Sequence, residues 1–338
     1  MTDVAIIGAG MAGLVCAQVL SQAGYSVQVV EKSRGLGGRV ATRRLHDTCA
    51  DHGVCYLKPK GELLGRFVEL LSLRHILEVW NYDPVPNYIA PEGMSAIAKF
   101  LAQNLQISLN QRVEAITPTA DNQWHLTFES SSEELIATSL VVAIPAPQAL
   151  MLLAPLGDLL NLAFLDNLRF VEFNSCITVM AGYPASSQPL PKWKDLTFVD
   201  DADLAWIGLD SSKRHNPQQP VFVVHSSANF AQLHLESPDL HSVAQLLLQR
   251  ATQSVQVSWL DTPEWMQVHR WRYAFPREAL TSAFLSAQTP SPLVCCGDWC
   301  GGKLVEGAML SGSAAAGEIN HQMRNVPLNN LKFLDFLK

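Results

Sequence analysis

Val4-Ala5-Ile6-Ile7 runs directly into Gly8-Ala9-Gly10-Met11-Ala12-Gly13, and this junction decides the fold. The apolar run predicts a buried strand, and the glycines predict a tight turn that opens a helix. Gly8 permits the turn, Gly10 lets the backbone approach a pyrophosphate, and Gly13 lets the helix pack closely on the strand. The free amides and positive end of such a helix favour phosphate. The candidate contacts are Gly8, Gly10, Met11, Ala12 and Gly13.

A second apolar run, residues 25–30, ends at Glu31 and Lys32, about 20 residues after the glycines. The Glu31 carboxylate can accept both hydroxyls of a ribose in charge-assisted hydrogen bonds of roughly 1.5–3 kcal/mol each. A 2′-phosphate at that position would be repelled. Strand, glycine turn, helix and acidic strand end together predict a site for the ADP half of a dinucleotide. A glycine-rich turn in an ordinary α/β protein is the alternative.

Composition excludes several classes of partner. The chain has 338 residues, enough for about two domains, and 48 % of them are hydrophobic. A formal net charge of −7 argues against nucleic acid or an anionic membrane as the main partner. No apolar run approaches the roughly 18–20 residues that span a bilayer, and the first strand leaves no room for a signal peptide, so we expect a cytoplasmic protein. The seven cysteines lie mostly in apolar segments without metal-ligand spacing, which predicts reduced thiols and no metal.

Periodicity divides the rest of the chain into segments of different kinds. Helices are predicted at 62–79 and 94–104, separated by a proline-rich break, and short strands at 107–109, 113–118 and 124–128. Residues 140–145 are apolar on both faces, as a central parallel strand must be. Further strands are predicted at 176–181, 204–209, 221–226 and 266–275, with a helix at 240–254, and the chain then returns to a buried strand at 293–298 and a helix at 305–320.

Two further glycine-rich stretches favour FAD over NAD, because a site for FAD must also hold the ribityl chain and the flavin ring. In the first, Gly37 and Gly38 let the backbone pass close to the pyrophosphate, and Arg39 offers a fork of donors to phosphate or ring oxygens. In the second, Asp298 could accept from a ribityl hydroxyl, and the amides of a helix start could face the flavin carbonyl edge. Those amides belong to Gly307, Ala308 and Met309. Val113 is a further candidate contact with FAD. We expect the FAD to be noncovalent.

These residues resemble the FAD-dependent amine oxidase superfamily and, within it, the renalases. The renalase-like stretches are residues 51–56, 89–95, 207–214, 223–226 and 269–273. The resemblance implies an α/β fold in which a Rossmann-like FAD-binding domain carries an inserted, mainly antiparallel β plus α substrate domain, as in amine oxidase and p-hydroxybenzoate hydroxylase-like architectures. We expect residues 1–58, 93–165 and 277–338 to form the FAD-binding domain, and residues 59–92 and 166–276 to form the substrate domain.

The resemblance also implies an activity. Renalases take a hydride from reduced nicotinamide nucleotides, notably isomeric forms, and pass the electrons to dioxygen to give hydrogen peroxide. We therefore expect a small-molecule substrate, a nicotinamide nucleotide, and dioxygen as the acceptor. The alternatives are a flavin amine oxidase or desaturase acting on an amine or an apolar substrate, and a non-catalytic FAD-containing binding or escort protein. No lysine is identified for the position that many amine oxidases hold near the flavin, since Lys303 sits in a glycine turn.

The candidate substrate-site residues come from the renalase-like stretches. His225 would hydrogen-bond a carboxamide, although its sequence context also fits a core histidine whose hydrogen bonds are made within the protein. Trp271, Tyr273 and Phe275 alternate along one strand and would wall an apolar slot or form an aromatic core face. Lys213 and Arg214 would meet substrate phosphates or serve as exposed turn charges. The family pattern places Tyr56 and His52 near the flavin or its pocket. From the sequence itself we expect Asp51 to brace the loop, and Arg43 and Arg44 to be solvated charges.

Overall fold

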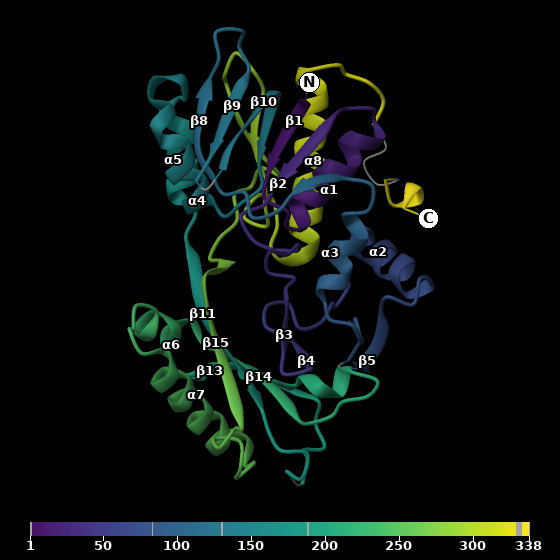
Figure 1. Cartoon of the computed structure of the whole chain (residues 1–338), viewed down its shortest axis with the longest axis vertical. Coiled ribbons are helices and arrows are strands. Elements are labelled where there is room, and N and C mark those ends of the chain that lie inside the picture. Colours follow the sequence, from purple (N-terminus) through teal and green to yellow (C-terminus); the bar gives the residue numbers. More distant parts are fainter. Residues whose placement is uncertain (1, 83, 130, 188, 329–332, 338) are drawn as a thin grey trace.

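A mainly parallel sheet carries the glycine turn at its centre (Figure 1). The computed structural model describes residues 2–82, 84–129, 131–187, 189–328 and 333–337. Within these residues the parallel strands follow the order β17 (Leu293–Cys295), β10 (Ser131–Val142), β1 (Thr2–Ile7), β2 (Val27–Val30) and β7 (Gln106–Ser108). Antiparallel strands extend it: β16 (Leu285–Ala287) pairs with β17, β9 (Trp124–Phe128) with the start of β10, and β8 (Val113–Pro118) with β9.

Strand β1 is buried on both faces, which explains its unbroken apolar sequence. Val4 and Ile6 enter a core shared with α1 (Met11–Gln22) and α8 (Leu304–Gln322). Ala5 and Ile7 enter the opposite core, which α4 (Ala146–Leu153) and α5 (Leu162–Phe170) cover together with η1 (Ala154–Leu159). The strand therefore holds the glycine turn rigidly from two sides.

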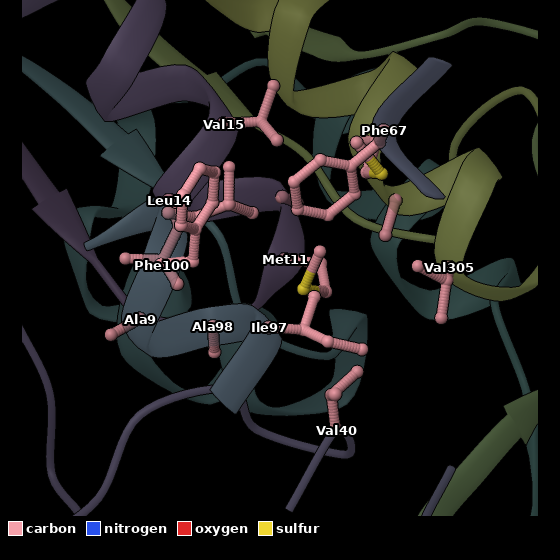
Figure 2. Close-up of a cluster of buried hydrophobic side chains, with 14 of the residues drawn as sticks. Ala9, Met11, Leu14, Val15, Val40, Phe67, Ile97, Ala98, Phe100 and Val305 are labelled. Carbon is pink, nitrogen blue, oxygen red and sulfur yellow. The ribbon is translucent and has the colours of Figure 1, made fainter. Parts of the chain in front are cut away.

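Helices α1 and α8 pack at very short range, side by side along the sheet (Figure 1). A Cβ added at Gly312 of α8 would lie 2.2 Å from the carbonyl oxygen of Ala12 in α1. Helices α2 (Glu62–Leu73) and α3 (Ser95–Leu101) close the same core, where Figure 2 shows side chains of α1, α3, Phe67 and Val305 meeting in one cluster. The short segment η3 (Phe333–Phe336) packs against α1. This core fixes where the amino end of α1 lies.

A second sheet has the order β12 (Asp195–Thr197), β13 (Leu204–Leu209), β14 (Val221–Ser226), β11 (Phe173–Gly182) and β15 (Trp265–Pro276), and it is antiparallel throughout. One face packs on α6 (Ala228–His234) and α7 (Leu240–Val255) through residues such as Val179, Phe222 and Leu247 (Figure 1). The opposite face, called here the inner face, meets two hairpins, β3–β4 (Thr42–Leu45 and Thr48–Asp51) and β5–β6 (Glu78–Tyr82 and Pro86–Ile89).

The predicted elements agree with the structure except in a few places. The helix expected at 62–79 ends at Leu73, because His75 adopts a left-handed conformation (φ 55°), and the chain then enters β5. The hairpins β3–β4 and β5–β6, the helices between 146 and 170, α6, and the short strands β12 and β16 were not predicted. The larger sheet draws its strands from 1–58, 93–165 and 277–338, and the second sheet from 166–276. The division into two domains stays a prediction that this distribution supports. None of the described helices has the length and apolar character to cross a bilayer.

Candidate functional site

The glycines of the first turn serve two distinct purposes. Gly8 has φ +106°, and a Cβ there would lie 2.7 Å from the carbonyl oxygen of Ala143. A Cβ at Gly13 would lie 2.0 Å from the carbonyl oxygen of Gly8. Both positions therefore require glycine for the fold itself. A Cβ at Gly10, in contrast, would meet no protein atom within 4 Å, so the space beside Gly10 is open to a ligand.

The second glycine turn lies directly beside the first. The Gly37 amide donates to the carbonyl oxygen of Ala9 at 2.9 Å, and both Gly37 (φ +103°) and Gly38 (φ +58°) have left-handed conformations. A Cβ at Gly38 would lie 3.6 Å from the Cα of Gly10. Two turns separated in sequence thus border one open space.

Helix α1 presents unpaired amides to this space. No described side chain caps it at Gly10, and its first internal hydrogen bond runs from the Leu14 amide to the Gly10 carbonyl oxygen at 2.9 Å. The amides that remain for a ligand belong to Met11, Ala12 and Gly13. They combine with the helix dipole to favour phosphate.

The predicted ribose-binding carboxylate lies at the same place. Glu31 is buried, and its two oxygens accept from the amides of Ala9 at 2.9 Å and Ser33 at 2.8 Å. The Gln111 amide donates to the Glu31 carbonyl oxygen, which brings Val113, at the start of β8, near the end of β2. Lys32 is exposed beside it. The carboxylate is therefore held at the glycine turn by backbone donors.

Arg39 and Asp298 bind each other, which differs from their predicted contacts with a ligand. Both guanidinium nitrogens of Arg39 lie 2.7 Å from the oxygens of Asp298, and Nη1 also donates to the carbonyl oxygen of Ala274 at 3.0 Å. The pair joins the second glycine turn to the segment after β17 and to β15. Its role in the structure is to connect three segments.

The start of α8 also differs from the prediction. The helix begins at Leu304, and the Gly307 amide already donates to the carbonyl oxygen of Lys303 at 3.3 Å. The amides of Ala308 and Met309 lie inside the helix, so the expectation that these three amides are free donors is wrong. The free amides of a helix are its first ones, which here belong to residues 304–306. Lys303 is exposed, at the N-cap of this helix.

A row of side chains crosses the inner face of the second sheet. Trp206 pairs with His225, His225 with Thr178, and Thr178 with His269 on successive strands. Directly opposed residues of antiparallel strands share a face, so all four project from the inner face. Alternation on β14 explains why His225 is there, since Phe222 and Val224 fill the core under α7.

His52, His269 and Trp271 form a compact ring cluster on this face. The His52 ring stacks on Trp271 with centroids 5.2 Å apart and meets His269 edge-on at 4.9 Å. The Trp271 indole donates to the His52 carbonyl oxygen at 2.8 Å. Tyr273 instead packs edge-on against Phe173 at 5.7 Å, and Phe275 is half exposed. Trp271 therefore belongs to the ring cluster, whereas the wall predicted to continue through Tyr273 and Phe275 stays a prediction.

Tyr56 faces the other end of the row. Its ring centroid lies 6.3 Å from that of Trp206 and 6.2 Å from that of Trp80. Between the two ends, the Sγ of Cys55 lies 3.7 Å from Nε2 of His225. The segment after β4 thus places His52, Cys55 and Tyr56 against one sheet face.

The histidines of the inner face are neutral at physiological pH. Burial lowers the pKa of His225 to about 4, and the charge of Lys213 adds to this effect. Burial lowers the pKa of His52 to about 3, with further lowering from His269 and Arg43. The pKa of His269 falls to about 4 through burial and Arg43. Burial also raises the pKa of the Cys55 thiol well above its usual range, so this thiol is protonated.

Four buried charges lie beneath the aromatic side chains: Asp51, Asp210, Lys213 and Arg214. Lys213 Nζ lies 2.7 Å from Asp210 and 3.4 Å from Asp51, and Arg214 Nη2 lies within 2.8 Å of both carboxylates. Despite burial, which disfavours the charged form, the two carboxylates raise the pKa of Lys213. Asp51 also accepts from the Thr42 hydroxyl and the Met94 amide, which confirms it as a brace of the loop.

The observed burial of these cations and of Arg43 corrects two predictions. The Lys213 and Arg214 side chains are 0 % and 9 % exposed, and their charges are already balanced, so they do not meet substrate phosphates. Arg43, expected in solvent, is half buried with Nη2 3.4 Å from Nδ1 of His269, whereas Arg44 is exposed as expected. Sequence reasoning also missed His269, Trp80 and Trp206. Strand alternation on β13 and β15 is the signal that could have placed Trp206 and His269.

Comparisons with known proteins agree with this architecture. The model of flavin containing amine oxidoreductases matches residues 70–320, and a model of NAD(P)-binding Rossmann-like domains matches residues 6–70. The chain belongs to the flavin containing amine oxidoreductase family. The predicted fold class and FAD as the cofactor are thereby confirmed.

Individual relatives match only a short segment. L-amino-acid oxidase of Crotalus adamanteus is 42 % identical over 71 residues, which is 21 % of this chain and 14 % of that protein. L-amino-acid oxidase of Echis ocellatus is 52 % identical over 42 residues, 12 % of this chain and 8 % of that protein. The chain thus matches about one seventh of the length of the first of these relatives.

Solved structures match over nearly the whole chain. The putative protoporphyrinogen oxidase from Exiguobacterium sp. 255-15 superposes with a TM-score of 0.73 and 13 % identity, covering 95 % of this chain and 99 % of that one. Putrescine oxidase bound to putrescine gives a TM-score of 0.66 with 14 % identity and the same coverage. At these identities the likeness establishes the fold alone.

The geometry of the glycine turns fits FAD. The open space beside Gly10, the three unpaired amides of α1 and the buried Glu31 provide a close backbone approach, phosphate donors and a ribose acceptor. The finer assignment of contacts to single residues is a proposal, taken up next.

Proposed function

We propose that the protein is a renalase-like FAD-dependent oxidase whose substrate is a reduced nicotinamide nucleotide, possible isomeric forms included. When bound, FAD would supply the redox chemistry: the substrate would lose a hydride to it, and dioxygen would take the two electrons and two protons to become hydrogen peroxide. In this proposal the FAD is noncovalent, and Gly10, Met11, Ala12, Gly13 and Glu31 contact its ADP half. A cytoplasmic location belongs to the same proposal.

The charges around the inner face are the observation that favours a nicotinamide nucleotide over an amine as the substrate. Amine substrates are cations, and a site for them needs a carboxylate or an open aromatic face. Asp51 and Asp210 are already paired with Lys213 and Arg214. The Lys213 ammonium itself lies 5.4 Å from the ring centroid of Trp80 and 6.0 Å from that of Trp206. Both carboxylates and these two aromatic faces are thus already occupied by cations of the protein, so they offer an amine cation no counterion, whereas a neutral ring needs none.

The neutral histidines support the same choice. A dihydronicotinamide is an uncharged ring with a carboxamide, which both donates and accepts hydrogen bonds. His225 is neutral and lies on the inner face, so one ring nitrogen donates and the other accepts; the Cys55 thiol, 3.7 Å from Nε2, is the contact that a carboxamide would replace. Trp271 and Tyr56 supply flat apolar surface on either side of the row. We therefore assign substrate contacts to His225, Tyr56, Trp271 and His52.

An amine oxidase is the second candidate, and the family match favours it. L-amino-acid oxidases and a putrescine oxidase are among the similar proteins. An amine cation would have to compete with Lys213 for the carboxylates and the aromatic faces, or the amine would have to bind uncharged. A non-catalytic FAD-containing escort protein is the third candidate, and the buried histidines would then serve packing alone.

Anaerobic rapid mixing separates the three candidates. The purified holoprotein is mixed with reduced nicotinamide nucleotides and their isomers, with amines and L-amino acids, and with an apolar polyene, while flavin absorbance is followed. Bleaching by a nicotinamide nucleotide alone is the expected result. Bleaching only by an amine, amino acid or polyene would favour the oxidase or desaturase alternative, and no bleaching by any donor would favour the escort protein.

A further inference from the structure

Arg43 is a cation without a counterion among the described residues. It forms none of the ion pairs found in the described part of the chain, and its Nε is buried without a hydrogen-bond partner. The only side-chain hydrogen-bond contact of Arg43 among the described residues joins Nη2 to Nδ1 of His269 at 3.4 Å. Leaving a charged donor buried and unpaired costs free energy. The nearest carboxylate on the adjoining strand, Asp51, is already held by Lys213 and Arg214.

A second unpaired group lies beside it. His52 is 5 % exposed, and its Nδ1 is buried without a partner. The His52 ring meets His269 at 4.9 Å, and His269 contacts Arg43. A buried imidazole and a buried guanidinium nitrogen that both lack partners therefore occur around one ring, His269. Buried polar groups in proteins almost always have hydrogen-bond partners, so these two nitrogens point to a bound group that partners both.

The position of Arg43 connects this group to the proposed substrate. Strand alternation on β3 turns Arg43 toward His269 of the inner face and leaves Arg44 exposed at a polar cleft of about 1030 Å³ with His46 and Trp265. The ring cluster of His52, His269 and Trp271 is shared with the substrate contacts assigned above. The unpaired nitrogens of Arg43 and His52 therefore border the residues assigned to the substrate.

We propose that Arg43, together with His52 and His269, binds an anionic oxygen group of the substrate, namely a phosphate of the nicotinamide nucleotide. The inference rests on the proposed function for the identity of the phosphate, while the anion site itself stands on the two unpaired groups. Guanidinium forks suit phosphate geometry, and the neutral imidazole can donate one further hydrogen bond. Arg43 is then a specificity-determining residue, which Arg44 on the same strand is not.

Binding of unreactive probes to the holoprotein tests this inference without turnover. Benzamide riboside 5′-monophosphate and benzamide riboside carry an uncharged, unreactive aromatic carboxamide and differ by one phosphate, and their dissociation constants are read from perturbation of flavin absorbance and tryptophan fluorescence. We expect the phosphate to tighten binding by about tenfold or more in the unsubstituted protein. Arg43→Gln should bring the two constants close together. The matched control, Arg44→Gln, should preserve their ratio.

A second arm separates failure of the anion site from failure of the proposed function. Inorganic phosphate and acetate are titrated into the same three proteins. If the two carboxamide probes do not bind but phosphate or acetate binds in an Arg43-dependent manner, the anion site stands and the nucleotide substrate is wrong. If Arg43→Gln fails to fold, Arg43→Lys keeps the charge but loses the fork, and an intermediate ratio is expected. Equal affinities of the Arg43 variant and the unsubstituted protein for every anion would overturn the inference.

Discussion

Replacing Lys213 by methionine tests the buried charge quartet most severely. Two carboxylates and two cations cancel in the folded protein, and Lys213→Met leaves one buried negative charge uncompensated. Asp210 loses its 2.7 Å contact with Lys213 but keeps the one with Arg214, while Asp51 keeps Arg214, the Thr42 hydroxyl and the Met94 amide. Removing one member of a buried ion pair costs about 3–5 kcal/mol. We expect the free energy of unfolding to fall by an amount near the lower end of that range, because Arg214 still touches both carboxylates.

Urea unfolding of the holoprotein, followed by circular dichroism and flavin fluorescence, measures this loss. The double variant Lys213→Met/Asp210→Asn restores neutrality and should recover part of the stability. Lys60→Met changes an exposed lysine and should stay within about 0.5 kcal/mol of the unsubstituted protein. A loss of less than about 1 kcal/mol for Lys213→Met, or no recovery in the double variant, would refute the reasoning.

Three further results are expected. Gly312→Ala places a Cβ 2.2 Å from the Ala12 carbonyl oxygen and should lower the free energy of unfolding by about 1–3 kcal/mol, and an unchanged urea midpoint would contradict the packing of α1 on α8. Denaturation followed by filtration should release all FAD, and yellow polypeptide on the filter would contradict noncovalent binding. His52 has a folded pKa of about 3 against about 6.5 unfolded, so the unfolded state binds more protons below pH 6.5 and stability is lost as pH falls through that window. His52→Phe should therefore flatten the decline of the urea midpoint between pH 7.5 and 5, and an equally steep decline in this variant would argue against a buried neutral imidazole.

The nucleotide-binding part of the fold could be predicted from sequence because its signals are local. The glycine spacing, the flanking apolar runs and Glu31 lie within about 30 residues and each has one physical explanation. The turn at Gly8 and the tight approach at Gly13 follow from contacts within that segment and with Ala143. These features required no knowledge of distant contacts.

The substrate side was harder to predict because its partners are distant in sequence. Asp51 and Lys213 are 162 residues apart, and Arg43 and His269 are 226 apart. A lysine and an arginine after a strand have the same local pattern whether they face solvent or two buried carboxylates. Whether such a cation is buried depends on the carboxylates it meets in the fold, and the local sequence does not show them. The same reason explains why Arg39 and Asp298, 259 residues apart, were expected to contact ligand rather than each other.

Element ends were another source of error with a physical cause. The apolar pattern continues past the end of α2, because Leu77, just before β5, and Trp80, within β5, are buried without belonging to a helix. The left-handed His75 is the point where the chain changes direction, and histidine is not a residue that marks such a turn in sequence. Burial alone therefore does not identify the type of element.

The affinity of Gly10→Ala apoprotein for FAD tests the central claim, that the two glycine turns and the amino end of α1 hold the cofactor. A Cβ at Gly10 meets no protein atom within 4 Å, and neither does one at Gly35, which serves as the control. The account predicts unchanged stability of both apoproteins, FAD binding weakened by about tenfold or more in Gly10→Ala, and normal binding in Gly35→Ala. Equal FAD affinity in Gly10→Ala and the unsubstituted protein would contradict it.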